Sequence, residues 1–184
     1  PLEYAKKHAL PFEKAREELL SNYRQYLGEL AWTDLDFWSR ELDIDIPRLK
    51  EDASHLIGLD PTAIDFLKFL KGLNKSVSLV TNAHWKTIEI KLRKTNIDEH
   101  LDRIISAFDI GMPKEKVLFW ERLRQRIGFE KERTLFIDDN EDVLRSAREY
   151  GLRHILQKGK TNLKGPSKSS NDFKSITDFS GLME

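Results

Sequence analysis

The chain has 184 residues, with 31 lysines and arginines against 31 aspartates and glutamates, so its formal net charge is zero at pH 7. This balance lacks the basic excess of nucleic-acid-binding proteins, and the absence of cysteine excludes disulfides and thiolate metal sites. No apolar run approaches the roughly 18 residues of a membrane span, and no signal-peptide pattern opens the sequence. We therefore expect a cytoplasmic protein that binds neither nucleic acid nor membrane.

Residues 1–58 have the periodicity of helices. Apolar spacing predicts one helix within 11–30 and two shorter ones at 32–42 and 47–57. This region also carries large aromatic side chains, among them Tyr26, Trp32, Phe37 and Trp38. They fit the core of a small helical layer, although stacking on a nucleotide base is an alternative.

From about residue 59 the pattern alternates between helices and strands. Helices are predicted from Asp60 through Leu70 and at 84–96, 114–128 and 141–151, and strands at 76–82, 103–108, 133–139 and 153–157. A polar loop, which we expect to be mobile, follows at 158–172, and a terminal segment at 173–183 is expected to dock on the body. The alternation predicts an α/β fold with a parallel sheet, whose ligand lies beyond the carboxyl ends of the strands.

Two adjacent carboxylates end one of these strands. Asp138 and Asp139 directly follow the apolar run Leu135-Phe136-Ile137. Neighbouring carboxylates disfavour each other's ionisation unless a cation compensates, and Mg²⁺ prefers such oxygen ligands. The alternative is the N-terminal region of the next helix, where acidic residues are favoured.

Other polar side chains follow two further strands. Thr81 and Asn82 offer donors to a phosphate oxygen, although capping of the next helix is an alternative. Lys114 is predicted at a helix start, where a cation opposes the helix dipole and could neutralise a phosphate. A solvated lysine is the alternative, and Lys116 is a rival in the same turn. His84 could contact a ligand or simply lie at the surface.

These residues resemble the motifs of the haloacid dehalogenase superfamily of phosphohydrolases. "LVTN" resembles the second motif, "GMPKEKVLFW" the third and "TLFIDDNEDVLRSAREYG" the fourth. The resemblance implies that Thr81, Asn82 and Lys114 bind phosphate, and that Asp139 with Asp138 holds Mg²⁺. In many relatives a proline follows the lysine of the third motif, whereas here Pro113 precedes it.

The match looks closer still to the bacterial GMP/IMP nucleotidases of that superfamily. "LDFWSRELDIDI", "HLDRIISAFDIGMPKE" and the final "SITDFSGLM" all resemble that group. The resemblance implies a three-layer Rossmann-like core at 59–184 and a helical cap at 1–58. It also implies a Mg²⁺-dependent phosphomonoesterase that acts on a purine nucleoside 5'-monophosphate through an aspartyl-phosphate.

The first motif of the superfamily, an Asp-x-Asp after an apolar strand, has no clear counterpart. The triplets Asp34-Leu35-Asp36 and Asp43-Ile44-Asp45 lie in helical sequence and follow no strand. We therefore expect the central first strand, with its nucleophile, to be missing, and residues 1–184 alone to be inactive. A non-catalytic module that binds phosphate or a partner is the alternative. A two-component receiver domain is excluded, because its acid pair comes early and its lysine last.

Overall fold

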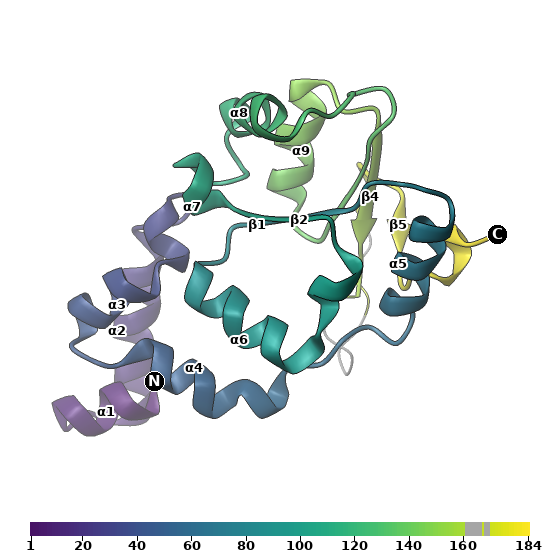
Figure 1. Cartoon of the computed structure of the whole chain (residues 1–184). Coiled ribbons are helices and arrows are strands. Elements are labelled where there is room, and N and C mark those ends of the chain that lie inside the picture. The colour runs from purple at the N-terminus through teal and green to yellow at the C-terminus, as the bar shows by residue number, and fades with distance from the viewer. Residues whose placement is uncertain (161–166, 168–169) are drawn as a thin grey trace.

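The computed structural model describes residues 1–160, 167 and 170–184 (Figure 1). The N-terminal part is helical, as the sequence predicts. Its four α-helices are α1 (Leu2–His8), α2 (Phe12–Arg24), α3 (Leu35–Leu42) and α4 (Ile46–Asp52), and 3₁₀ turns lie at Leu30–Thr33 and Ala53–Leu56. No helix of the described residues is both long and apolar enough to cross a membrane.

A small aromatic core holds the N-terminal helices together. Leu19, Trp38 and Leu42 are buried at its centre. The Trp38 ring makes edge-to-face contacts with Tyr23, at 4.3 Å between centroids, and with Tyr26, at 5.5 Å. Such contacts add to the burial of apolar area. Most of the aromatic residues of this region therefore pack against one another, as expected for the core of a small helical layer.

The remaining chain alternates between helices and parallel strands. Its elements are α5 (Ala63–Gly72), β1 (Ser78–Thr81), α6 (Trp85–Thr95), β2 (Arg103–Ser106), α7 (Ala107–Ile110), α8 (Val117–Ile127), β3 (Leu135–Asp138), α9 (Glu141–Tyr150), β4 (His154–Lys158) and β5 (Ser175–Ile176). A 3₁₀ turn at Ile97–His100 precedes β2 and another at Ser180–Leu182 follows β5. The predicted α/β class is confirmed, and the predicted helices and strands follow one another in the predicted order, whereas α7 and β5 were not predicted.

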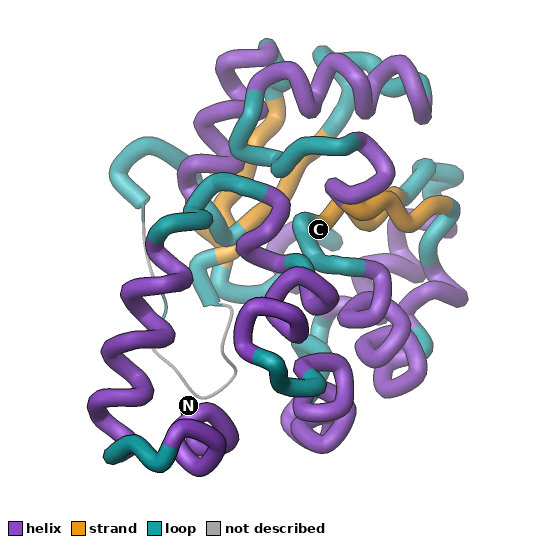
Figure 2. Tube along the Cα trace, turned by 90° about the vertical axis from the view of Figure 1, so that its left-hand side faces the viewer, coloured by secondary structure: helices purple, strands orange, loops and turns teal. Residues whose placement is uncertain are grey.

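The strands form two small sheets (Figure 2). β1 pairs with β2 in one, and β3, β4 and β5 pair in that order in the other; every pairing is parallel. Within the described residues, no ladder joins the sheets, so β1 and β3 each pair along one edge only. This is the arrangement expected if a strand between β1 and β3 is missing.

The main core lies under α8 and α9. Phe119, Trp120 and Val143 are almost completely buried there, and the Trp120 ring lies 4.6 Å from that of Phe136 in β3. Asn140 caps α9 by accepting the N–H of Asp142, and Gly151 ends it at φ 104°, a conformation that glycine adopts without strain. The core thus fixes the end of β3 against both helices.

Several boundaries differ from the prediction, and two of these differences bear on the site. The helix predicted at 114–128 begins at Val117, so Lys114 lies in the preceding turn and the argument from an opposed helix dipole was wrong. The Lys114 carbonyl, which a helix starting there would pair with a later backbone N–H, accepts instead from the Trp120 and Ser146 side chains, and Lys116 is extended at φ -90° and ψ 130°. The strand predicted at 103–108 ends at Ser106, whose side chain caps the short α7 in a capping box with Asp109.

The terminal segment docks on the body, as predicted. The Phe179 ring stacks on Phe66 of α5 with 5.1 Å between centroids, and the Phe179 N–H donates to the Thr62 hydroxyl. The predicted mobile loop at 158–172 falls largely on residues that lie outside the described part of the chain.

Candidate active site

Lys114 lies between the ends of β1 and β3. Its ammonium donates to the Val80 carbonyl at 3.2 Å and forms an ion pair with Asp138. The two side chains are only 8% and 10% exposed. A carboxylate and an ammonium so far out of water are stable only when paired and hydrogen-bonded. Lys114 is therefore the cation that compensates Asp138.

The two neighbouring aspartates have different surroundings. Asp138 also accepts the Asn140 N–H at 3.0 Å, whereas Asn140 itself supplies the cap of α9. Because Asn140 supplies the cap of α9, helix capping does not explain the adjacent pair Asp138 and Asp139. Although Asp139 as a residue is exposed, partial loss of water around its carboxyl group and then the negative charge of Asp138 raise its pKa.

Asn82, the first residue after β1, forms hydrogen bonds with the turn that contains Lys114. Its side-chain oxygen accepts the Lys114 N–H at 2.9 Å, and its amide nitrogen donates to Glu115 at 2.8 Å. The Thr81 hydroxyl accepts the Ala83 N–H at 3.1 Å, which shapes the same loop. Lys114 is thus linked to Asn82 and Asp138 at the carboxyl ends of the strands, and Thr81 directly precedes Asn82 at the end of β1.

The rival lysine points elsewhere. Lys116 is 52% exposed and pairs at 3.4 Å with Glu29, which precedes the first 3₁₀ turn. Of the two lysines, only Lys114 enters the site. Burial therefore favours Lys114 in the choice that the displaced proline left open in the sequence.

Three residues of the site carried no sequence signal that we used. Glu115 contacts the loops after both β1 and β3. The Lys114 carbonyl accepts from the buried Trp120 indole at 3.1 Å and from the buried Ser146 hydroxyl at 2.6 Å. These bonds join residues 6 and 32 positions apart, so only the fold brings them together. For Glu115, its position directly after Lys114 could have served as a signal.

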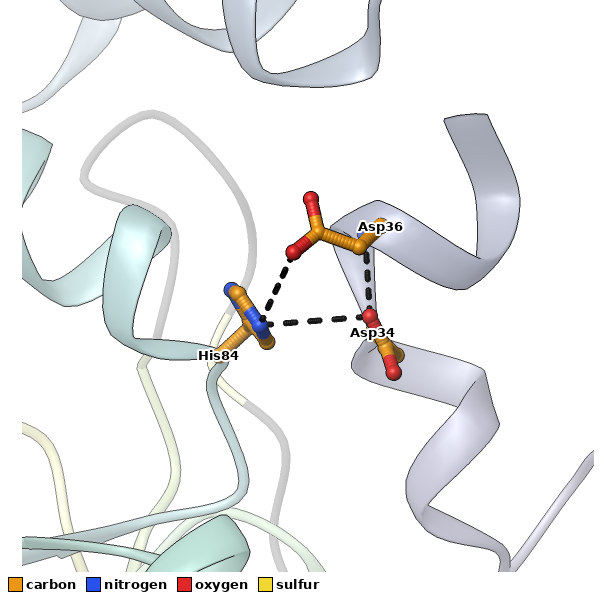
Figure 3. A group of neighbouring side chains, drawn as sticks. All are labelled: Asp34, Asp36 and His84. Atoms are coloured by element: carbon orange, nitrogen blue, oxygen red, sulfur yellow. Dashed lines mark hydrogen bonds and ion pairs between the residues drawn. The ribbon is translucent and has the colours of Figure 1, made fainter. Parts of the chain in front are cut away.

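Asp34, Asp36 and His84 form a second group, where α3 meets α6 (Figure 3). The His84 Nε2 lies 3.9 Å from a carboxylate oxygen of each aspartate. However, its Nδ1 accepts the Lys86 N–H, so in the neutral ring the proton sits on Nε2, and no lone pair faces the acids. Lys86 also pairs with Asp36. The group therefore suits a contact between the N-terminal helices and α6 better than a metal site.

Neither Asp-x-Asp triplet follows a strand among the described residues. Asp34 caps α3 by accepting the N–H groups of Asp36 and Phe37, and Asp45 caps α4. Asp43 occupies the left-handed position that ends α3, where it pairs with Lys7. Both triplets thus have structural explanations as helix ends.

Asp138 and Asp139 offer the donor set that Mg²⁺ prefers. Both are carboxylates at adjacent positions, and the pKa of Asp139 is raised by burial and by the charge of Asp138, although Lys114 partly offsets this rise. A divalent cation would supply further positive charge. The residues present therefore fit a magnesium ion.

The ion pair gives a first prediction. Lys114→Met or Asp138→Asn alone should lower the free energy of unfolding by about 3–5 kcal/mol, because each leaves its partner buried and uncompensated. The double variant should lose clearly less than the sum of the two. Urea denaturation of the four proteins measures the cycle. The exposed Lys116–Glu29 pair is the matched control, for which we expect less than about 1 kcal/mol. Additive losses at Lys114 and Asp138 would contradict the pairing.

Asp139 gives a second prediction. Its raised pKa means that the folded state holds the carboxyl proton more tightly than the unfolded chain does. The associated stability is present below the unfolded pKa and is lost as pH rises through the folded pKa. Asp139→Asn should therefore raise the melting temperature at pH 7 with a chelator present, and the gain should shrink as pH falls toward 4. Asp142→Asn, in the first turn of α9, is the control and should slightly destabilise. A stability loss in Asp139→Asn at pH 7 would overturn the prediction.

Known proteins share both the sequence and the fold of this chain. It is 35% identical over 162 residues to the GMP/IMP nucleotidase YrfG of Escherichia coli (strain K12), covering 88% of this chain and 72% of that protein. It is 29% identical over 141 residues to the (S)-2-haloacid dehalogenase of Pseudomonas fluorescens, covering 77% and 57%.

Solved structures and a family model agree with these relatives. A phosphatase of the haloacid dehalogenase group from Thermococcus onnurineus has a TM-score of 0.79 at 20% identity, covering 97% of this chain and 82% of that one. The family model for "haloacid dehalogenase-like hydrolase" matches residues 2–151. The chain therefore belongs to the haloacid dehalogenase-like hydrolases.

Proposed function

We propose that residues 1–184 form the larger part of a Mg²⁺-dependent phosphomonoesterase that hydrolyses a purine nucleoside 5'-monophosphate, GMP or IMP. The observation that carries the proposal is the buried Lys114 ammonium, held between the Val80 carbonyl and Asp138 where two parallel strands end. The similarity to the GMP/IMP nucleotidase supports the substrate class.

In this proposal Thr81 and Lys114 bind the phosphoryl oxygens. The hydroxyl donates a hydrogen bond, and the ammonium offsets the charge that develops as the phosphoryl group is transferred. Because Lys114 already pairs with Asp138, the phosphate shares this cation with the carboxylate. The side chain of Asn82 is engaged with residues 114 and 115, so it contributes by fixing the turn that presents Lys114.

Asp139, together with Asp138, would hold the magnesium ion. The bound ion supplies positive charge beside the phosphoryl group. Lys114 already compensates Asp138, so the carboxylate with the raised pKa, Asp139, gains most from the ion. This difference supports Asp139 as the principal ligand.

We assign the attack on phosphorus to an aspartate outside residues 1–184, at the end of a strand that fits between β1 and β3. Its carboxylate displaces the ribose oxygen and forms an aspartyl-phosphate, which water then hydrolyses. A second carboxyl group beside it protonates the leaving oxygen and then accepts a proton from that water. Within the described residues, β1 and β3 each pair along one edge only, which supports this placement.

We further propose that residues 1–58 form a cap over the site and residues 59–184 the catalytic core. The Thr33 hydroxyl donates to the Asn82 carbonyl at 2.6 Å, and Lys86 pairs with Asp36. The helical part therefore lies directly against the loop after β1. A cap in this position can shield the phosphoryl group from water and contact the nucleoside.

The proposal predicts that residues 1–184 release no phosphate from GMP or IMP with Mg²⁺. The protein extended by the coding sequence before Pro1 should hydrolyse both, and CMP much more slowly. Asp139→Asn in the extended protein should stay folded and lose about 100-fold or more of kcat/KM. Phosphate release measured with and without a chelator tests each protein.

Two results would redirect the assignment. Mg²⁺-dependent hydrolysis of GMP by residues 1–184 alone would refute the missing nucleophile and direct attention to Asp34 or Asp43. An extended protein that binds phosphate without turnover would support a non-catalytic phosphate-binding module instead.

A further inference from the structure

The Glu115 side chain spans the loops that follow β1 and β3. One carboxylate oxygen accepts from the Asn82 amide nitrogen at 2.8 Å, and the other accepts from the Asn140 amide nitrogen at 3.2 Å. Asn82 is the first residue after β1, and Asn140 is the second after β3. The two strands belong to sheets that share no ladder within the described residues. One carboxylate thus ties the two sheets together at the site.

Both amides are also fixed at their other end. The Asn82 side-chain oxygen accepts the Lys114 N–H, and that of Asn140 accepts the Asp142 N–H, each at 2.9 Å. Since an N–H must face the amide oxygen, the NH₂ group of each asparagine has to face Glu115. The orientation of both amides therefore follows from the network, and a carboxylate is the group that can accept from both.

The backbone that carries Glu115 is itself anchored. The Lys114 carbonyl accepts hydrogen bonds from the side chains of Trp120 and Ser146. These two residues are 1% and 4% exposed. Lys114 bridges the strands with a cation, and Glu115 bridges the loops above them with an anion. Because this backbone is held by buried contacts, Lys114 and Glu115 can fix the spacing between the ends of β1 and β3.

We propose that Glu115 is a positioning residue for the phosphoryl site. By holding Asn82 and Asn140, it sets the distance between Thr81, at the end of β1, and Asp139, in the loop after β3. The ligand in this inference rests on the proposed function, whereas the bridge between the loops does not. Glu115 acts through the two asparagines and has no direct role in phosphate binding.

Replacing the charge and shortening the side chain separate two possible roles. Glu115→Gln keeps the length but leaves only one acceptor for two NH₂ groups. Glu115→Asp keeps the charge but is one methylene shorter. If Glu115 acted only as a nearby negative charge, Glu115→Gln would tighten phosphate binding and Glu115→Asp would leave it unchanged. If Glu115 is a bridge, both variants weaken binding.

The experiment uses the chain of residues 1–184 with Mg²⁺ and inorganic phosphate as the probe. Titration calorimetry should show about tenfold weaker phosphate binding for both variants, as expected for the loss of one charge-assisted hydrogen bond. Side-chain amide resonances of Asn82 and Asn140, recorded by ¹⁵N NMR, should shift in both variants. Glu121→Gln, at an exposed glutamate of α8, is the matched control and should change neither measurement.

Unchanged asparagine resonances in both Glu115 variants would overturn the inference, as would tighter phosphate binding in Glu115→Gln. If the unmodified chain binds no phosphate, the phosphate-binding roles in the proposed function fail. The asparagine resonances then still decide whether Glu115 bridges the loops.

Discussion

The candidate site depends on one buried cation, the Lys114 ammonium between the Val80 carbonyl and Asp138. The two strands whose ends it joins belong to separate sheets in the described part of the chain. Ladder hydrogen bonds, which normally fix neighbouring strand ends, are therefore replaced here by side-chain contacts. Desolvating two charges is costly, and only their close pairing offsets that cost. The arrangement of the strand ends at the site is thus only as stable as this ion pair and its supporting contacts.

The contacts that hold the backbone of Lys114 come from both sides of the space between β1 and β3. Asn82 holds the Lys114 backbone N–H, while Trp120 and Ser146 hold its carbonyl. The turn at 113–116 consequently does not join α8, and Lys114 extends away from the helix toward the strands. A lysine in the first turn of α8 would have met the positive end of the helix dipole. The contacts that delay the helix are thus the same ones that aim the ammonium.

The sequence predicted most of the helices and strands and their order, because apolar periodicity and helix-ending glycines such as Gly151 are local signals, but it did not predict the short α7 and β5. It also predicted that Thr81, Lys114 and Asp138 would meet, because parallel strands end at one edge. It could not predict the start of α8 or the bridge made by Glu115. The first depends on the bond from Ser146 to the Lys114 carbonyl and the second on Asn82, and both partners are more than 30 residues away along the chain. Burial, which distinguishes Lys114 from Lys116, also appears only in the fold. The roles assigned to these residues in binding and catalysis stay predictions.

Two carboxylates that look equivalent in the sequence are unequal in the structure. Asp138 has an ammonium and a backbone N–H as partners, and it lies almost out of water. Asp139 lies beside that charge and has a raised pKa. Lys114 pairs directly with Asp138 and only partly offsets the rise in the pKa of Asp139, so further positive charge from a divalent cation would favour the ionised Asp139. The unequal compensation of Asp138 and Asp139 is therefore the physical argument for the proposal that a metal ion and a phosphate-binding lysine share this site.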